Sequence, residues 1–221
     1  MLASAPIVKR TVSRIVGGTG MSRILAVSIE TAEEPQRSLL EKVRAQVGYI
    51  SGTQRLLLVD PQIGVPGKQL HDYLNLRPES PFSRIQREMV ATVVNGMIGA
   101  KPCLSAHCEA LRRLTADDDL GPEFVERWPD YPMDAPTLAL LHYARKLTGW
   151  PDRITDHDIE TLREVGWDDR AIYEATALIA MFNFSGRIEA ASGLPMDEIP
   201  AEADLPIARP DGRPGGLAVK A

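Results

Sequence analysis

Cysteine is scarce in this chain of 221 residues, which contains Cys103 and Cys108 and no other cysteine. If both lie on one helix, the rise along the axis alone separates them by about 7.5 Å. That separation exceeds the usual Cα distance of a disulfide, and two cysteines cannot supply the disulfide framework of a small secreted domain. A reducing compartment fits best, and we expect a cytoplasmic protein.

Long apolar runs and an excess of positive charge are also missing. No stretch approaches the ~20 apolar residues of a membrane helix. The net charge of −5 and the pI near 5.5 give no electrostatic signature of nucleic-acid binding. We therefore expect neither a membrane nor a nucleic acid as partner, and a small molecule or a protein instead. His142 and His157 show no zinc-ligand spacing to either cysteine, so neither a metal nor a cofactor is expected.

Apolar residues recur at helical spacing through most of the chain. Together with caps, prolines and glycines, they predict helices over 34–47, 56–59, 70–74, 82–95, 100–113, 134–149, 155–166 and 168–193. The stretch with Pro61, Gly64, Pro66 and Gly67 predicts a connection instead. No internal repeat is evident, and the fold class expected is all-α.

Composition changes at both ends of the chain. Residues 1–23 contain four basic residues, no acidic residue and a glycine-rich patch. We interpret them as a flexible extension from an upstream start, with Met21 as the natural beginning. A targeting leader is the alternative, although the continuous apolar segment of a secretory signal is absent. Residues 24–198 form the predicted helical domain, and residues 199–221 a flexible tail rich in Pro, Gly, Ala and Asp.

The stretch 100–113 predicts a helix with a cysteine in its first turn. Pro102 suits the start of a helix because its missing N–H would be unpaired there anyway. Unpaired N–H groups and the helix dipole favour a thiolate at Cys103. His107 projects from the same face, about 40° around the axis and roughly 6 Å along it. This spacing makes Cys103 a candidate nucleophile with His107 as its base.

A purely structural role is the alternative for these residues. Free cysteines are usually buried and act as small apolar groups. Cys108 lies in mid-helix, away from the unpaired N–H groups, and is interpreted as a packing residue. Glu88 lies off the centre of the apolar stripe of its helix, so periodicity alone places it in solvent beside Arg84 or Arg87.

Glu88, Cys103 and His107 together resemble the motif of the alkylhydroperoxidase AhpD-like, or carboxymuconolactone decarboxylase-like, family. Its members carry an Arg-Glu pair on one helix, followed by a Cys-x-x-Cys motif. A histidine, usually in an Ala-His pair, follows the second cysteine by four residues. Here Arg87 and Glu88 match the first pair, Cys103 matches the second cysteine, and Ala106 with His107 match the last pair.

The downstream sequence resembles the peroxidase-related branch of this family. The residues that carry this likeness are Leu147, Thr148, Ile154 to Asp158, Leu162, Gly166, Trp167, Phe182, Asn183, Phe184 and Arg187. The resemblance covers about residues 22–198. It implies an AhpD-like helical fold, assembled as a homo-oligomer with helices packed across subunits.

The chain departs from the family motif at the first cysteine. Ala100 occupies that position, and Pro102 precedes the retained cysteine. The resemblance therefore implies an antioxidant peroxidase with a single catalytic cysteine. Cys103 would attack a hydroperoxide and become a sulfenic acid, His107 would relay the proton and Glu88 would orient it. An external thiol or a partner protein would then reduce the sulfenic acid.

Two further interpretations stay open. Carboxymuconolactone decarboxylases share the fold without a cysteine cycle, so Glu88 and His107 could perform acid-base chemistry on a small carboxylated lactone. Cys103 would then only line the pocket. The third interpretation is a degenerate member that binds a ligand or has a structural role in an oligomer.

Overall fold

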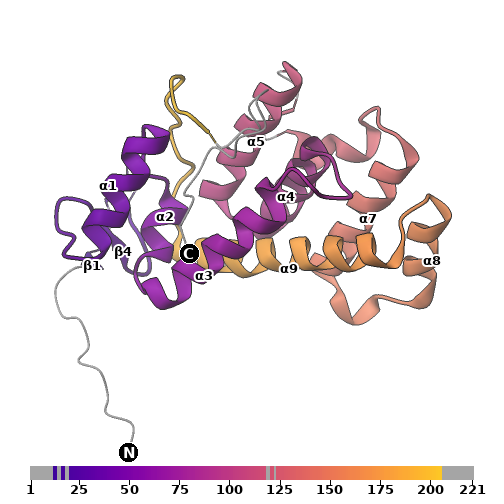
Figure 1. The fold of residues 1–221 in the computed structure, drawn as a ribbon, viewed down its shortest axis with the longest axis horizontal. Helices are drawn as coiled ribbons and strands as arrows, with labels where there is room; N and C mark the ends of the chain where they lie inside the picture. The colour runs from indigo at the N-terminus through magenta and orange to yellow at the C-terminus, as the bar shows by residue number, and fades with distance from the viewer. Residues whose placement is uncertain (1–11, 14–15, 18–19, 118–119, 122, 206–221) are drawn as a thin grey trace, which may run out of the picture.

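The protein is described by a computed structural model that covers residues 12–13, 16–17, 20–117, 120–121 and 123–205. Helices dominate this part of the chain (Figure 1). The longer ones are α1 (Gln36–Val47), α3 (Pro61–His71), α4 (Arg84–Ile98), α5 (Lys101–Thr115), α7 (Ala135–Gly149), α8 (Asp156–Glu164) and α9 (Asp169–Ser192). The shorter ones are α2 (Gly52–Leu57), the π-helix η1 (Asp72–Leu76), α6 (Phe124–Arg127), and the 3-10 turns η2 (Trp128–Asp130) and η3 (Pro151–Arg153).

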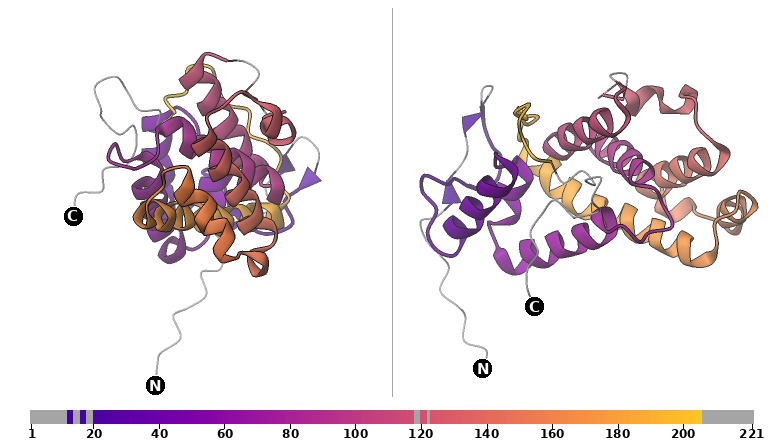
Figure 2. Two further views of the ribbon diagram at one scale, coloured as in Figure 1. Left: turned by 90° about the vertical axis from the view of Figure 1, so that its right-hand side faces the viewer. Right: turned by 45° about the horizontal axis from the view of Figure 1, so that its top comes forward.

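The helices pack around α4 and α9. The longest helix, α9, runs along the molecule, and α4, α5 and α7 lie beside it in all three views (Figures 1 and 2). All nine side chains from Arg87 to Asn95 of α4 are buried. Helix α4 is therefore surrounded by other elements, and its polar side chains must find partners inside the protein.

Side-chain caps define where several helices begin. Ser83 and Gln86 form a capping box at the start of α4, and Thr155 and Asp158 form one at the start of α8. Asp168 caps α9 by accepting a hydrogen bond from the Ala171 N–H. The prediction of an all-α fold is confirmed, including the helices expected over 34–47, 82–95, 134–149 and 168–193.

The connection predicted around Pro61 to Gly67 is wrong, because this segment forms α3. Pro61 takes the first helical position, where no N–H donor is needed, and Asp60 caps it through the Gln62 N–H. Gly64 serves close packing: a Cβ there would lie 2.0 Å from the Leu57 carbonyl oxygen. Helix α3 continues directly into η1, whose last three residues, Leu74, Asn75 and Leu76, are buried.

Short strands and an extended segment lie near the two ends of the described chain. Strand β1 (Val12–Ser13) pairs with β4 (Ala26–Val27), and β2 (Val16–Gly17) pairs with β3 (Gly20–Met21), both antiparallel. Residues 199–205 approach α5, where Arg113 donates to the Ala203 carbonyl at 2.6 Å. Much of the predicted extension 1–23 and of the predicted tail 199–221 lies outside the described residues.

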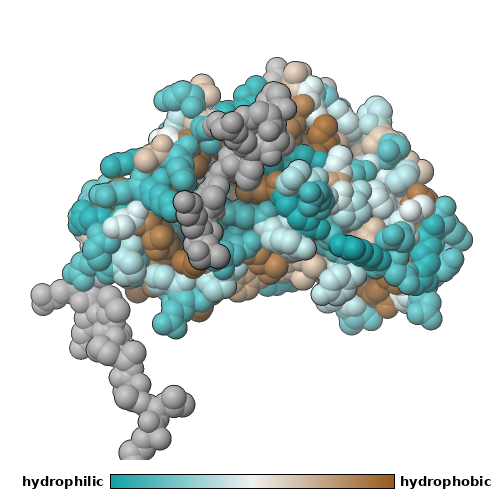
Figure 3. All heavy atoms as spheres, viewed as in Figure 1, coloured by the Kyte–Doolittle hydropathy of each residue, from teal (hydrophilic) through white to brown (hydrophobic). Residues whose placement is uncertain are grey.

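The surface is mainly hydrophilic on the face drawn in Figure 3, where hydrophobic side chains form smaller patches between polar ones. No helix of the described chain has the length and apolar character needed to cross a membrane. The homo-oligomer and the cytoplasmic location stay predictions.

The close approach at Gly64 yields a stability prediction. Gly64→Ala should destabilise the protein by about 2 kcal/mol, because the new methyl group overlaps backbone that cannot move without shifting α2. Gly67→Ala in the same helix is the matched control. Its Cβ would meet only the Phe184 ring, at 3.3 Å, and alanine favours a helix over glycine. Urea unfolding measures both, and equal stability of the two variants would contradict the packing argument.

Candidate active site

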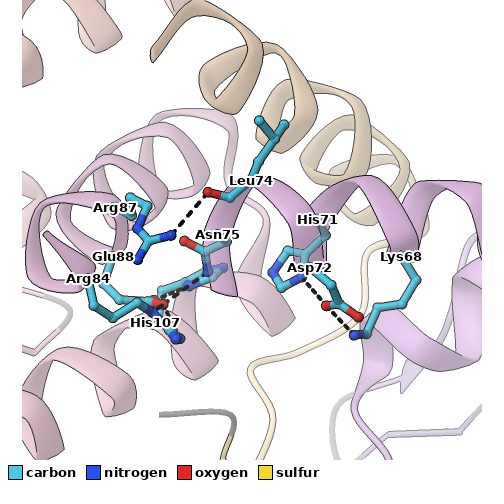
Figure 4. Close-up of polar contacts among 9 residues, drawn as sticks. All are labelled: Lys68, His71, Asp72, Leu74, Asn75, Arg84, Arg87, Glu88 and His107. Carbon is cyan, nitrogen blue, oxygen red and sulfur yellow. Dashed lines mark hydrogen bonds and ion pairs between the residues drawn. The ribbon is translucent and has the colours of Figure 1, made fainter. Parts of the chain in front are cut away.

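Glu88 is the centre of a buried polar network. Its Oε1 accepts hydrogen bonds from Arg84 Nε at 2.6 Å and Asn75 Nδ2 at 3.0 Å, and its Oε2 lies 2.5 Å from His107 Nδ1. Figure 4 shows these partners converging from α4, α5 and η1. The sequence places Glu88 in solvent, and that expectation is wrong, since its exposed fraction is 0%.

The charge of Glu88 follows from its partners. Burial alone would raise the pKa of this carboxyl, but Arg84 and His107 outweigh burial and hold the pKa well below its ordinary value. Glu88 is therefore ionised and can only accept hydrogen bonds. It follows that His107 donates through Nδ1–H, and that Nε2 is the basic nitrogen of the ring.

Arg87, the neighbour of Glu88, has a different role. Its guanidinium donates to the carbonyls of Arg77 at 2.8 Å and Leu74 at 3.4 Å, at the end of η1 (Figure 4). Burial lowers its pKa to about 10. Arg87 thus fixes the π-helical turn that carries Asn75 to Glu88.

A second imidazole lies close to His107. The ring centroids of His71 and His107 are 6.3 Å apart, and both rings stand edge-on to Phe182. His71 Nδ1 lies 3.0 Å from Asp72 Oδ1, and Lys68 contacts the same oxygen. Figure 4 shows this pair at the junction of α3 and η1. Sequence periodicity gave no reason to single out His71 or Asp72.

The two imidazoles line one cavity of about 140 Å³. His71, Arg84, Cys103 and His107 contribute to its wall, together with Thr53. The further apolar lining residues are Val43, Val47, Leu57, Leu76, Ala106, Ala110, Met181, Phe184 and Leu205, and the further polar ones are Gln46, Tyr49, Ser51, Gln54, Lys68 and Ser185. An apolar cavity of ~150 Å³ binds a molecule the size of benzene, so this one can hold a small organic ligand beside the thiol.

Cys103 lies at the start of α5, as predicted, and is 7% exposed. Its backbone N–H donates to Glu189 Oε2 at 2.9 Å, and the Thr53 hydroxyl donates to Glu189 Oε1 at 2.7 Å. The Thr53 hydroxyl also lies 3.7 Å from the Cys103 sulfur. A carboxyl group therefore occupies the anion-binding end of α5 that the sequence assigns to a thiolate.

The prediction of a stabilised thiolate is wrong for this resting state. Burial raises the pKa of the Cys103 thiol well above its ordinary value, and Glu189 raises it further. Burial likewise raises the pKa of Glu189. Cys103 is therefore a neutral thiol at neutral pH, and a base must remove its proton before it can act as a nucleophile.

The structure brings the three predicted site residues into one region, with His107 joining the other two. His107 bonds Glu88 directly and shares the cavity wall with Cys103. Cys108 is buried away from this wall, and burial raises its thiol pKa to about 12. Glu189 was missed, although it continues the buried stripe of α9 seven residues after Phe182. A charged residue within an apolar stripe is the sequence feature that could have marked Glu189 as a member of the site.

Comparison with known proteins finds solved structures that have a similar fold. No protein-family model and no curated protein matches the chain. A solved peroxidase-related protein from Silicibacter sp. TM1040 is 26% identical, with a TM-score of 0.68 over 75% of this chain and 86% of that one. An AhpD-core, peroxidase-related protein from Ralstonia eutropha JMP134 is 20% identical, with a TM-score of 0.71 over 80% and 93%.

The debrominase Bmp8 has the same fold at 16% identity, with a TM-score of 0.62 over 76% of this chain and 90% of that one. One of its structures is a cysteine-to-alanine variant bound to 2,3,4-tribromopyrrole. The prediction that this chain resembles the AhpD-like, peroxidase-related proteins is confirmed by these structures.

The buried network predicts a large stability effect at Glu88. Glu88→Gln should lower the free energy of unfolding by about 3 kcal/mol, because it leaves Arg84, whose side chain is only 10% exposed, without its counter-ion. The pKa of Glu88 is lowered in the folded state. The difference in free energy of unfolding between wild type and Glu88→Gln should therefore be largest above about pH 4.5 and should shrink as the pH falls below that value. Urea unfolding at several pH values measures this.

Glu109→Gln is the matched control for that measurement. Glu109 pairs with Arg112 and Arg113 near the surface, so its loss should cost less than about 1 kcal/mol. Equal costs at the two positions would show that burial does not strengthen the Glu88 network.

The Glu189 contact predicts how Cys103 titrates. In wild type, iodoacetamide should react slowly with Cys103 at neutral pH and faster as the pH rises. Glu189→Gln removes the neighbouring negative charge, so the thiol pKa should fall. Alkylation at pH 7 should then accelerate. Mass spectrometry in a Cys108→Ala background measures the rate.

Glu174→Gln provides the comparison, because Glu174 is also a buried carboxylate of α9 but pairs with Arg77. In Glu174→Gln, the rate of Cys103 alkylation against pH should match that of wild type. An unchanged or slower profile for Glu189→Gln would show that Glu189 does not hold the thiol in its neutral form.

Proposed function

Starting from the AhpD-like, peroxidase-related likeness, we propose that the protein is an oxidoreductase that reduces a small organic hydroperoxide through the thiol of Cys103. The observation that supports this most is the shared cavity. It brings a cysteine together with a histidine whose tautomer is set by an ionised carboxylate. Thiol, base and orienting acid are the three groups that an activated nucleophile requires.

The proposed reaction begins with the neutral thiol. His107 Nε2 takes the proton of Cys103 as the sulfur attacks the terminal oxygen of the hydroperoxide. The S–O bond forms while the O–O bond breaks, so sulfur is oxidised to a sulfenic acid and the hydroperoxide is reduced to an alcohol. The proton held on His107 passes to the departing alkoxide. Glu88 holds the ring in place and stabilises its charged form.

The catalytic cycle must be completed from outside the motif. Ala100 stands where a resolving cysteine would lie, and Cys108 is buried with a pKa of about 12. Two equivalents of an external thiol would therefore reduce the sulfenic acid, releasing water and a disulfide and restoring the Cys103 thiol. A protein dithiol could supply the same two sulfur atoms.

A second candidate function follows from the raised pKa of Cys103. The pair of Glu88 and His107 is complete without the sulfur, and its basic Nε2 belongs to the same cavity. Acid-base chemistry on a small carboxylated lactone, of the carboxymuconolactone decarboxylase type, would use this pair alone. The two candidates differ in whether Cys103 is needed.

Replacement of Cys103 separates them. Under the proposed function, Cys103→Ser should lower the rate of cumene hydroperoxide consumption at least 100-fold, because serine cannot form the sulfenic acid. Mass spectrometry with dimedone should trap a sulfenic acid on Cys103 in wild type. Cys108→Ala is the control and should keep the wild-type rate, since Cys108 lies outside the cavity wall.

A Cys103→Ser protein that still consumes hydroperoxide would exclude the thiol mechanism. Turnover of a carboxylated lactone that survives Cys103→Ser and is lost in His107→Gln would favour the acid-base function. Inert thiols and no turnover of either substrate class would indicate a protein that has kept the fold without the chemistry.

A further inference from the structure

The proposed chemistry leaves several polar side chains of the cavity without a role, and His71 is the imidazole among them. His71 contributes to the wall from the junction of α3 and η1, and Figure 4 shows it to the side of the network of Glu88 and His107. Asp72 and Lys68 accompany it, and Phe182 packs against both imidazoles. A polar ring held by these contacts in the same cavity wall as the proposed nucleophile can contact a bound ligand.

We infer that His71 binds the substrate, with its Nε2 accepting a hydrogen bond from the terminal O–H of the hydroperoxide. The inference deepens the proposed function and rests on it for the identity of the ligand. A small organic hydroperoxide has one O–H donor and an apolar remainder. The cavity offers an imidazole acceptor for the first and a largely apolar wall for the second.

The tautomer of His71 is set by its neighbours. Burial would raise the pKa of Asp72, but the contacts with His71 and Lys68 outweigh it and lower that pKa, so Asp72 is ionised and accepts from His71 Nδ1–H. Burial lowers the pKa of His71 itself, which keeps the ring neutral at neutral pH. Nε2 is then the nitrogen that carries the free lone pair.

The position of His71 also suits the direction of attack. His107 lies one helical turn from Cys103 on α5, and the ring of His71 is centred 6.3 Å from that of His107. A hydroperoxide in the cavity that both rings line can give its O–H to His71 while His107 exchanges protons with the sulfur and the leaving oxygen. His71 thus orients the substrate, and His107 transfers the proton.

Direct binding tests this assignment without turnover. The probe is tert-butyl hydroperoxide, titrated into the Cys103→Ser protein and followed by NMR. Adding His71→Leu should weaken binding about tenfold, the loss of one neutral hydrogen bond. Adding His71→Gln should restore most of the affinity, because its Oε1 can accept near the position of Nε2. His157→Leu on α8 is the control and should leave binding unchanged.

A second ligand isolates the O–H group. tert-Butyl methyl peroxide lacks this donor, so it should bind the Cys103→Ser protein equally well with and without His71→Leu. Equal affinity of tert-butyl hydroperoxide for the two proteins would overturn the inference. So would a His71→Gln variant as weak as His71→Leu, or no detectable binding in the Cys103→Ser background.

The two proposals fail in different ways. If wild type consumes no hydroperoxide but binding depends on His71, the oxidoreductase function is refuted and the binding site stands. If wild type consumes hydroperoxide while binding is indifferent to His71, the function stands and the role of His71 is refuted.

Discussion

The buried carboxylate of Glu88 is the interaction on which the site depends. It joins α4, α5 and η1 through His107, Arg84 and Asn75. A charge with no exposure to solvent is tolerated only where several donors compensate it. That requirement fixes the His107 tautomer. It also connects His107, which lines the cavity, to Glu88 of α4. Arg87 extends the constraint by holding the end of η1 against α4.

The same demand for satisfied polar groups governs the nucleophile. The N-terminus of α5 needs acceptors for its unpaired N–H groups, and Glu189 supplies one to Cys103. A carboxylate there competes with a thiolate for the same positive potential. Burial and, after it, this carboxylate raise the pKa of the Cys103 thiol and keep the sulfur neutral. This environment distinguishes the site from one that stores a preformed thiolate.

Part of the site was predictable because its residues are close in sequence. Cys103 and His107 share one helix, so their common face follows from helical geometry. Glu88 was assigned through the family resemblance, whereas periodicity placed it in solvent. Periodicity assumes one buried and one exposed face, and α4 has other elements all around it. Glu189, Thr53 and His71 come from distant segments, and their approach to Cys103 and His107 is a property of the packing.

By itself, the sequence determined the helical fold class, most helix boundaries, the absence of a second motif cysteine and the spacing of the cysteine and histidine. These features follow from local rules of capping, apolar period and residue identity. Tertiary structure decided which charges are buried, which partner meets each one and how the thiol titrates. A pKa depends on the groups that surround a residue in space, and here those groups come from helices far apart in the sequence, which only the fold brings together.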